Sequence, residues 1–190
     1  MPLNQRRCTN IPKIEIKKKV IIVGTNAVGK TSLLNSFINR KFDFDYKATL
    51  GVNILAKQYP LNDETTLTFS FWDLGGQKLF RNIYPRFFAM SNAAMIVFDV
   101  TRMDSFDDIM NWHTTIINYL NANIPILLVG NKIDLIKERV VPSSNGLKLA
   151  NEQKFIYTET SAKTGENVDN LFKKLAETLA KPILDSYKTV

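Results

Sequence analysis

The octapeptide Gly24-Thr25-Asn26-Ala27-Val28-Gly29-Lys30-Thr31 follows the apolar run Val20-Ile21-Ile22-Val23 and leads into Ser32-Leu33-Leu34-Asn35-Ser36-Phe37. The pattern G-x-x-x-x-G-K-[ST] between a strand and a helix predicts a loop that wraps around a phosphate chain. Glycine lets the backbone approach the phosphates where side chains would collide, and successive N–H groups then face the anion. The helix that begins near Lys30 adds the positive end of its dipole. A chance glycine-rich turn is the alternative, and the strand and helix contexts disfavour it.

Two side chains of this loop have predicted roles of their own. Lys30 should reach the β- and γ-phosphates as a mobile positive charge, and the Thr31 hydroxyl is a ligand suited to Mg²⁺. The predicted nucleotide-binding residues of the loop are Asn26, Ala27, Val28, Gly29, Lys30, Thr31 and Ser32.

The 190 residues, 45% of them hydrophobic, suffice for one α/β domain with a buried core. The longest apolar runs, such as residues 93–98, are far shorter than the ~18 residues of a transmembrane helix. Residues 1–8 lack the apolar segment of a secretory signal, and a single cysteine excludes an internal disulfide. We therefore expect a cytoplasmic protein, with peripheral membrane residence as the alternative.

The net charge of +7 is concentrated at the N-terminus. Six basic residues and one acid within residues 1–20 contribute +5, so the remainder of the chain is nearly neutral. A protein that binds nucleic acid through its folded body needs a basic face there, with exposed aromatic residues between the charges. The sequence therefore predicts no nucleic-acid partner.

The alternation of strands and helices predicts a doubly wound, mostly parallel six-stranded sheet with helices on both faces. The strands are expected at 14–23, 52–59, 66–72, 93–99, 124–129 and 155–159, and the later helices at 105–120, 143–151 and 168–180. The short turn at residues 61–64 joins the second and third strands as a hairpin, which makes one edge strand antiparallel. We expect a flexible basic tail at 1–13, one domain at 14–181 and a short tail at 182–190.

Polar residues follow several of these strands at the sheet edge where ligands of such folds bind. Asp73-Leu74-Gly75-Gly76-Gln77, Asn131-Lys132-Ile133-Asp134 and Ser161-Ala162-Lys163 follow strands, and Thr49 lies in the polar segment just before the second strand. Each alone could be a turn or cap residue, but four in the expected order favour a single site. Guanine presents N1–H and an exocyclic amine side by side, and the Asp134 carboxylate is placed to accept both. Adenine lacks that pair of donors.

From about Ile16 to Ala180 the sequence resembles the Ras-like small GTPases, which are P-loop nucleotide hydrolases with a small G domain. Residues 48–52, 98–101 and 160–168 look most like the Rab branch, whereas the Gly75-Gly76 pair is similar to Arf proteins and some septation GTPases. The resemblance implies a switch that binds GTP or GDP with Mg²⁺ and slowly hydrolyses GTP. It also implies an exchange factor, a GTPase-activating protein and effectors as partners.

The resemblance assigns further residues to the base. Asn131 would tie the base loop to the phosphate loop, the Lys132 stem would lie over the base, and the Ala162 N–H would face guanine O6. Phe42 would pack edge-on to the base, with simple core filling as the alternative. The remaining predicted nucleotide-binding residues are Tyr46, Ser161 and Lys163.

For hydrolysis, the resemblance makes Thr31 and Thr49 the metal ligands and gives Asp73 a metal-bound water. Gln77 would orient the attacking water, Gly76 would contact the γ-phosphate, and Lys30 and Thr49 complete the predicted catalytic set. Loss of the γ-phosphate would release Thr49 and Gly76 together, so residues 42–50 and 73–87 are the predicted switch segments.

Three residues depart from the family pattern. Asn26 stands where Ras has a glycine whose replacement hinders an incoming arginine finger, and Gly75 replaces an alanine and should loosen the second switch. Lys78 replaces a glutamate that helps exchange factors. Asn26 and Gly75 favour the alternative function, a guanine-nucleotide-binding interaction module that scarcely hydrolyses GTP.

Outside the site, Ile54, Trp72 and Phe87 fall on the positions where Rab proteins form an effector surface, with mutual packing as the alternative. The C-terminal residues 185–190 contain no cysteine for prenylation, and Pro2 excludes Arf-type myristoylation. At most a weak electrostatic membrane contact by the basic tail is expected. His113 is interpreted as a surface residue and Trp112 as a core residue.

Overall fold

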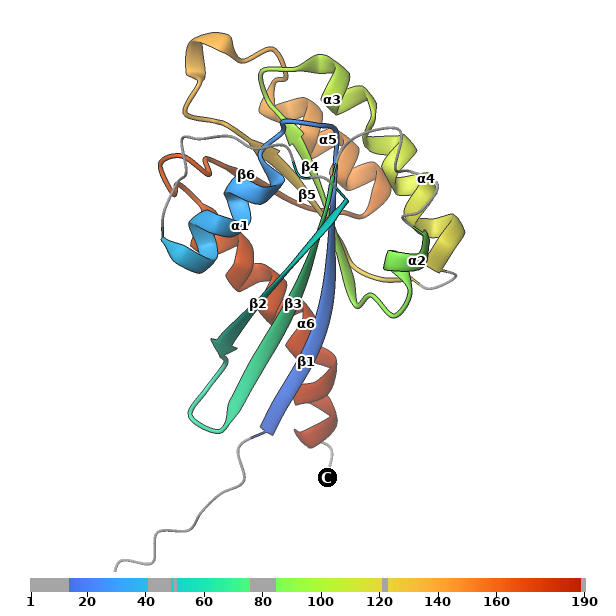
Figure 1. The fold of residues 1–190 in the computed structure, drawn as a ribbon, viewed down its shortest axis with the longest axis vertical. Coiled ribbons are helices and arrows are strands. Elements are labelled where there is room, and N and C mark those ends of the chain that lie inside the picture. The colour runs from blue at the N-terminus through green and yellow to red at the C-terminus, as the bar shows by residue number, and fades with distance from the viewer. Residues whose placement is uncertain (1–13, 41–48, 50, 76–84, 121–122, 189–190) are drawn as a thin grey trace, which may run out of the picture.

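The computed structural model describes residues 14–40, 49, 51–75, 85–120 and 123–188, and its centre is a six-stranded sheet (Figure 1). The strand order is β2-β3-β1-β4-β5-β6, and only β2 runs antiparallel to its neighbour. This confirms the predicted doubly wound fold. The strands are β1 (Ile14–Val23), β2 (Val52–Pro60), β3 (Thr65–Leu74), β4 (Ala93–Asp99), β5 (Ile126–Asn131) and β6 (Ile156–Thr160).

Helices cover both faces of the sheet (Figure 1). The described helical elements are α1 (Lys30–Asn39), α2 (Pro85–Phe88), α3 (Met103–Asp107), α4 (Ile109–Leu120), the 3₁₀ turn η2 (Ile136–Glu138), α5 (Ser143–Gln153) and α6 (Val168–Lys188). Residues of α1 and α6 belong to one core cluster, and residues of α2, α4 and α5 belong to the other.

Strand β1 explains why the sheet is buried on both sides. Successive side chains of a strand point to opposite faces, and here Val20 and Ile22 enter one core while Ile21 and Val23 enter the other. All four side chains are fully buried, as is typical of a central parallel strand. Full burial of each such side chain contributes ~1.5–3 kcal/mol to folding. The loop that follows β1 therefore begins from a rigid support.

The hairpin between β2 and β3 forms as the sequence predicts. The Asn62 Oδ1 atom accepts hydrogen bonds from the backbone N–H groups of Glu64 (3.0 Å) and Thr65 (2.7 Å). An asparagine side chain that binds the backbone two or three residues ahead closes a tight turn. The turn places β2 at the edge of the sheet.

Strands β5 and β6 end further along the chain than the sequence predicts. Gly130 and Asn131 continue β5 because they pair with Phe98 and Asp99 on one side and with Glu159 and Thr160 on the other. Asn131 is consequently held inside the sheet at its carboxyl edge.

Two predicted helices form with bounds that differ from the prediction. The helix expected at 105–120 begins at Met103 and is divided at Asp108, whose φ of −78° and ψ of −7° bend the chain without leaving the helical region. The last helix does not end near 180, and the expected tail from 182 is largely helical, since α6 reaches Lys188. Pro182 gives up one backbone donor, but its fixed φ suits a helix, and Ile183 still packs against the core.

His113 on α4 is less exposed than the sequence suggested. Its ring lies edge-on to Phe155, with ring centroids 4.8 Å apart and an interplanar angle of 82°. Burial lowers the pKa of His113 below its ordinary value.

The lowered pKa predicts a pH dependence of stability. The unfolded chain binds the imidazole proton more tightly than the folded chain does, so the free energy of unfolding should fall as pH drops through about 6.5. Urea unfolding between pH 7.5 and 5.5 should show this fall in the unaltered chain and a smaller fall in His113→Gln. Equal slopes in the two proteins would show that His113 does not titrate differently on folding.

Candidate nucleotide-binding site

The loop between β1 and α1 can form only with glycine at its two ends. Gly24 has a φ of 141°, and a Cβ atom there would lie 2.1 Å from the Val97 carbonyl oxygen. Gly29 has a φ of 94°, and a Cβ atom there would lie 2.3 Å from Asn131 Nδ2. Both positions combine a left-handed backbone with a close neighbour, which any side chain would disturb. The loop thus passes tightly between β4 and the end of β5.

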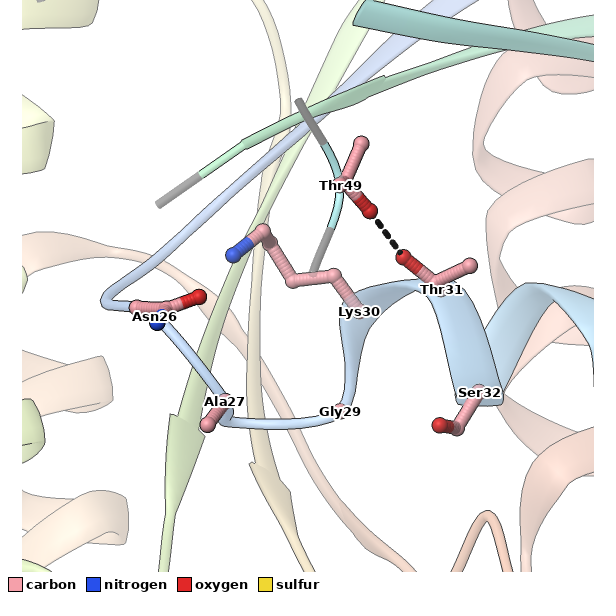
Figure 2. Close-up of a pocket in the computed structure, with 7 residues that line it drawn as sticks. All are labelled: Asn26, Ala27, Gly29, Lys30, Thr31, Ser32 and Thr49. Carbon is pink, nitrogen blue, oxygen red and sulfur yellow. Dashed lines mark hydrogen bonds between the residues drawn. The ribbon is translucent and has the colours of Figure 1, made fainter. Parts of the chain in front are cut away.

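Lys30 is 5% exposed and is held inside the loop, where it lines a pocket with Asn26, Ala27 and Thr49 (Figure 2). Its Nζ atom donates to the carbonyl oxygens of Gly24 (2.8 Å) and Thr25 (3.1 Å). An ammonium group has three N–H donors, so one remains for an anion. Burial lowers the pKa of Lys30 to about 8, while the negative charge of Asp73 acts in the opposite direction. A bound phosphate would stabilise the charged form of this lysine.

Three of the predicted metal-site side chains meet beside Lys30. The hydroxyl groups of Thr31 and Thr49 are 2.7 Å apart (Figure 2), and the Thr31 hydroxyl also donates to Asp73 Oδ2. Asp73 is fully buried, and burial raises its pKa while the hydrogen bond from Thr31 opposes that shift.

The second oxygen of Asp73, Oδ1, is buried and has no hydrogen-bond partner among the residues that the structure describes. A buried carboxylate oxygen without a partner is costly unless a donor or a cation reaches it. Hydroxyl and carboxylate oxygens are hard ligands of the kind that Mg²⁺ prefers. The donor set therefore fits a magnesium ion with its bound water.

Gly75 brings the two predicted switch segments together. Its N–H donates to the Gly51 carbonyl oxygen at 2.9 Å, and a Cβ atom on Gly75 would lie 2.4 Å from the Thr49 carbonyl oxygen. The sequence suggested that this glycine loosens the second switch. That loosening stays a prediction, and in the described geometry the missing side chain permits a close backbone approach. The predicted site residues Phe42, Tyr46, Gly76 and Gln77 lie outside the described residues.

Asn131 joins three segments of the site. Its Nδ2 donates to the Val28 carbonyl oxygen (2.9 Å) in the phosphate loop. Its Oδ1 accepts from the Ala162 N–H (3.1 Å) and the Thr160 hydroxyl (3.3 Å). Asn131 is 1% exposed, so these bonds are made away from water. Asn131 therefore lies where the sequence predicts, between the base loop and the phosphate loop. The Ala162 N–H, which was expected to face guanine O6, donates instead to Asn131 in this structure.

The base-side residues are also fixed by their neighbours. The Ser161 hydroxyl donates to Asp134 Oδ1 at 2.6 Å and accepts the Thr164 N–H at 3.0 Å. Lys132 adopts a left-handed φ of 71°, and its Nζ lies 2.5 Å from the buried carboxylate of Asp99. Lys163, in contrast, is exposed. Asp99 was missed in the sequence, although its position at the end of β4 marked the same sheet edge.

The three predicted effector-surface residues are brought together. Ile54 pairs with Trp72 across β2 and β3, and the rings of Trp72 and Phe87 have centroids 6.0 Å apart. Ile54 is 53% exposed. The Nζ atom of Lys19 lies 3.9 Å from the centre of the Trp72 ring and donates to the Ala89 carbonyl oxygen at 2.9 Å. Whether an effector binds here stays a prediction.

The fold and the site together define a P-loop nucleotide-binding domain on a doubly wound sheet. The defining features are a phosphate loop with glycine at both ends, a buried carboxylate beside two threonine hydroxyls, and a base loop linked to the phosphate loop by an asparagine. The family model described as "Ras: Ras family" matches residues 19–181. The chain belongs to the Ras family, and so to the Ras-like small GTPases that act as molecular switches.

Proposed function

We propose that this chain is a magnesium-dependent small GTPase switch that binds GTP and GDP and slowly hydrolyses GTP to GDP. The observation that carries the proposal is the position of Asn131, which links the phosphate loop at Val28 to the base-side loop at Ala162. A protein that binds the guanine base and the phosphates of one nucleotide needs the phosphate loop and the base-side loop in a fixed relative position.

Base selection is assigned to Asp134. Ser161 orients this carboxylate through the 2.6 Å hydrogen bond, so its lone pairs are presented in a fixed direction. A site built around the two adjacent donors of guanine should reject adenine by a factor on the order of 10⁴. The Lys132–Asp99 ion pair would hold the lysine stem against the base.

Phosphate binding is assigned to the loop N–H groups and Lys30, and metal binding to Thr31, Thr49 and Asp73. Magnesium, when bound, would neutralise negative charge on the phosphates. Thr49 and Gly75 come from the two predicted switch segments, and their close approach supports coupled ordering of these segments by the γ-phosphate. Gln77 and Gly76 are proposed as the water-orienting residue and the γ-phosphate contact.

Within the superfamily we propose a Rab-like branch with an Arf-like second switch, on the sequence segments quoted above. The exposed Ile54 beside the Trp72–Phe87 pair supports an effector surface. An exchange factor, a GTPase-activating protein and effectors are the proposed partners. Among the described residues, no helix is both long and apolar enough to cross a membrane. We propose a cytoplasmic location with, at most, weak electrostatic contact with membranes.

The Gln77→Leu variant tests the hydrolytic part of the proposal. Unassisted turnover of the unaltered protein should be slow, on the order of 10⁻⁴ to 10⁻³ s⁻¹. Gln77→Leu should lower that rate further and leave the affinity for GTP intact, because leucine cannot orient a water molecule. Single-turnover hydrolysis of bound GTP, with a parallel GTP binding titration, gives both quantities.

The same experiment separates the second candidate function. An interaction module that holds GTP as a structural ligand would bind GTP tightly but show no turnover above the rate of free GTP. Asn26, at the mouth of the pocket, supports that alternative (Figure 2). An unchanged rate in Gln77→Leu would show that another residue positions the water.

A further inference from the structure

Arg102 directly precedes α3 and forms a hydrogen bond with the phosphate loop. It is not one of the residues that line the pocket. Its Nη1 atom donates to the carbonyl oxygen of Asn26 at 2.8 Å. Its other two nitrogen atoms, Nε and Nη2, donate to the two carboxylate oxygens of Asp104 at 3.2 and 2.7 Å. A guanidinium group is planar and rigid, so the fork with Asp104 fixes the direction of the third donor. The Asn26 carbonyl is therefore held by an oriented side chain.

The hydrogen bond from Arg102 to the Asn26 carbonyl oxygen sets the direction of the Ala27 N–H group. In a planar trans peptide the C=O of one residue and the N–H of the following residue point in opposite directions. A donor that holds the Asn26 oxygen outward therefore turns the Ala27 N–H to the opposite side. Ala27 lines the pocket together with Lys30 and Thr31, as Figure 2 shows. No hydrogen-bond partner of the Ala27 N–H is found in the described parts of the chain.

Ala27 needs such support because its backbone is unfavourable. Its φ is 63°, in the left-handed region that residues with a Cβ atom rarely adopt. Alternation of left-handed and ordinary conformations is what turns successive N–H groups toward one anion. Without an external contact, an alanine at this position would tend to leave that conformation and carry its N–H away from the anion.

A second contact from the same segment supports the same loop. The Thr25 hydroxyl donates to Asp108 Oδ2 at 3.2 Å, so the two residues before Ala27 are both tied to residues 102–108. Lys30 Nζ also donates to the Thr25 carbonyl oxygen, at 3.1 Å. The loop is thus fixed between a lysine within the pocket and two side chains outside it.

We propose that Arg102 is a positioning residue for phosphate binding: it holds the Asn26–Ala27 peptide so that the Ala27 N–H faces the phosphate chain beyond the α-phosphate. The inference rests on the proposed function, since it requires a nucleotide phosphate in this loop. It assigns a role to a side chain that is not among the predicted nucleotide-binding or metal-binding residues. Residues 102–108 become the external support of the phosphate loop.

The test compares GDP with GMP, because only GDP has a phosphate beyond the first. Arg102→Ala should weaken GDP binding roughly 10- to 100-fold, the range expected when a hydrogen bond involving a charged group is lost. GMP binding should change little, so the ratio of the two affinities should shrink. Arg102→Lys keeps a positive donor and should restore part of the ratio. Arg40→Ala is the control, because it also removes a surface arginine that is bound to an aspartate: Arg40 Nη1 donates to both carboxylate oxygens of Asp169.

Phosphorus NMR of bound GDP gives a readout independent of affinity. The β-phosphate resonance should move in Arg102→Ala and stay in place in Arg40→Ala. Asp104→Asn should lower the ratio of GDP affinity to GMP affinity in the same direction but by less. This variant replaces Arg102→Ala in the test if Arg102→Ala does not fold. Equal losses for GDP and GMP, or an unchanged ratio with an unmoved resonance, would overturn the positioning role. Failure of the unaltered chain to prefer GDP over GMP would instead refute the proposed function.

Discussion

Asp134→Asn is expected to move the base preference of the protein from guanine toward xanthine. The substitution replaces one acceptor oxygen by an amide donor, which then faces the donor groups of guanine. Xanthine carries a carbonyl oxygen where guanine carries the exocyclic amine, so the new donor finds an acceptor. The ratio of GDP affinity to XDP affinity should fall by a factor on the order of 10⁴. A change of this size is expected when the wrong ligand leaves buried polar groups of the site without hydrogen-bond partners.

Competition titrations with GDP and XDP measure this ratio. The Ser161 hydroxyl can still donate to the Oδ1 atom of the new asparagine, so the local fold should survive. Asp63→Asn is the matched control, since it makes the same chemical change on an exposed carboxylate in the distant β2–β3 turn. Retention of full GDP preference in Asp134→Asn would mean that another group reads the base.

Asn131→Ala is expected to give the second large effect. The change leaves the Val28 carbonyl, the Ala162 N–H and the Thr160 hydroxyl without their partner in a buried setting. Each unsatisfied buried group costs about 1–3 kcal/mol. Since the same bonds hold the two loops together, GDP affinity should fall by at least roughly 100-fold, and the free energy of unfolding should fall as well.

GDP dissociation rates and urea unfolding measure the two parts of that effect. Asn151→Ala removes an exposed asparagine on α5 and is the control for loss of an amide. If Asn131→Ala lost stability but kept the GDP dissociation rate, the link between the loops would be structural only.

Much of this fold could be predicted because short sequence signals coincide with strong physical constraints. Val20–Val23 is an apolar run typical of a buried strand, and the glycines at 24 and 29 mark the tight loop that follows it. The asparagine-containing turn at 62 identifies the antiparallel edge. Asn131 and Asp134 were found because polar residues directly after an apolar strand mark the ligand-binding edge of such sheets.

Other features escaped because they depend on contacts between distant segments. The hydrogen bond between Arg102 and Asn26 spans 76 positions of sequence, and nothing near Arg102 indicates that it meets the phosphate loop. The Lys132–Asp99 pair is hidden for the same reason. The extension of α6 past Pro182 depends on core packing by Ile183, which local helix signals cannot show. The contact of Lys19 with Trp72 is likewise not visible in the sequence, because Trp72 lies on the neighbouring strand.

Identification of the nucleotide that the purified protein carries, followed by competition between GTP and ATP in the presence of Mg²⁺, tests the central claim most directly. We predict that the released nucleotide is GDP or GTP and that GTP outcompetes ATP by a factor on the order of 10⁴. Omission of Mg²⁺ should weaken GTP binding, because the Asp73 carboxylate and the two threonine hydroxyls would lose the cation that they are proposed to hold. Release of an adenine nucleotide, or equal binding of ATP and GTP, would contradict the assignment of a guanine-nucleotide switch.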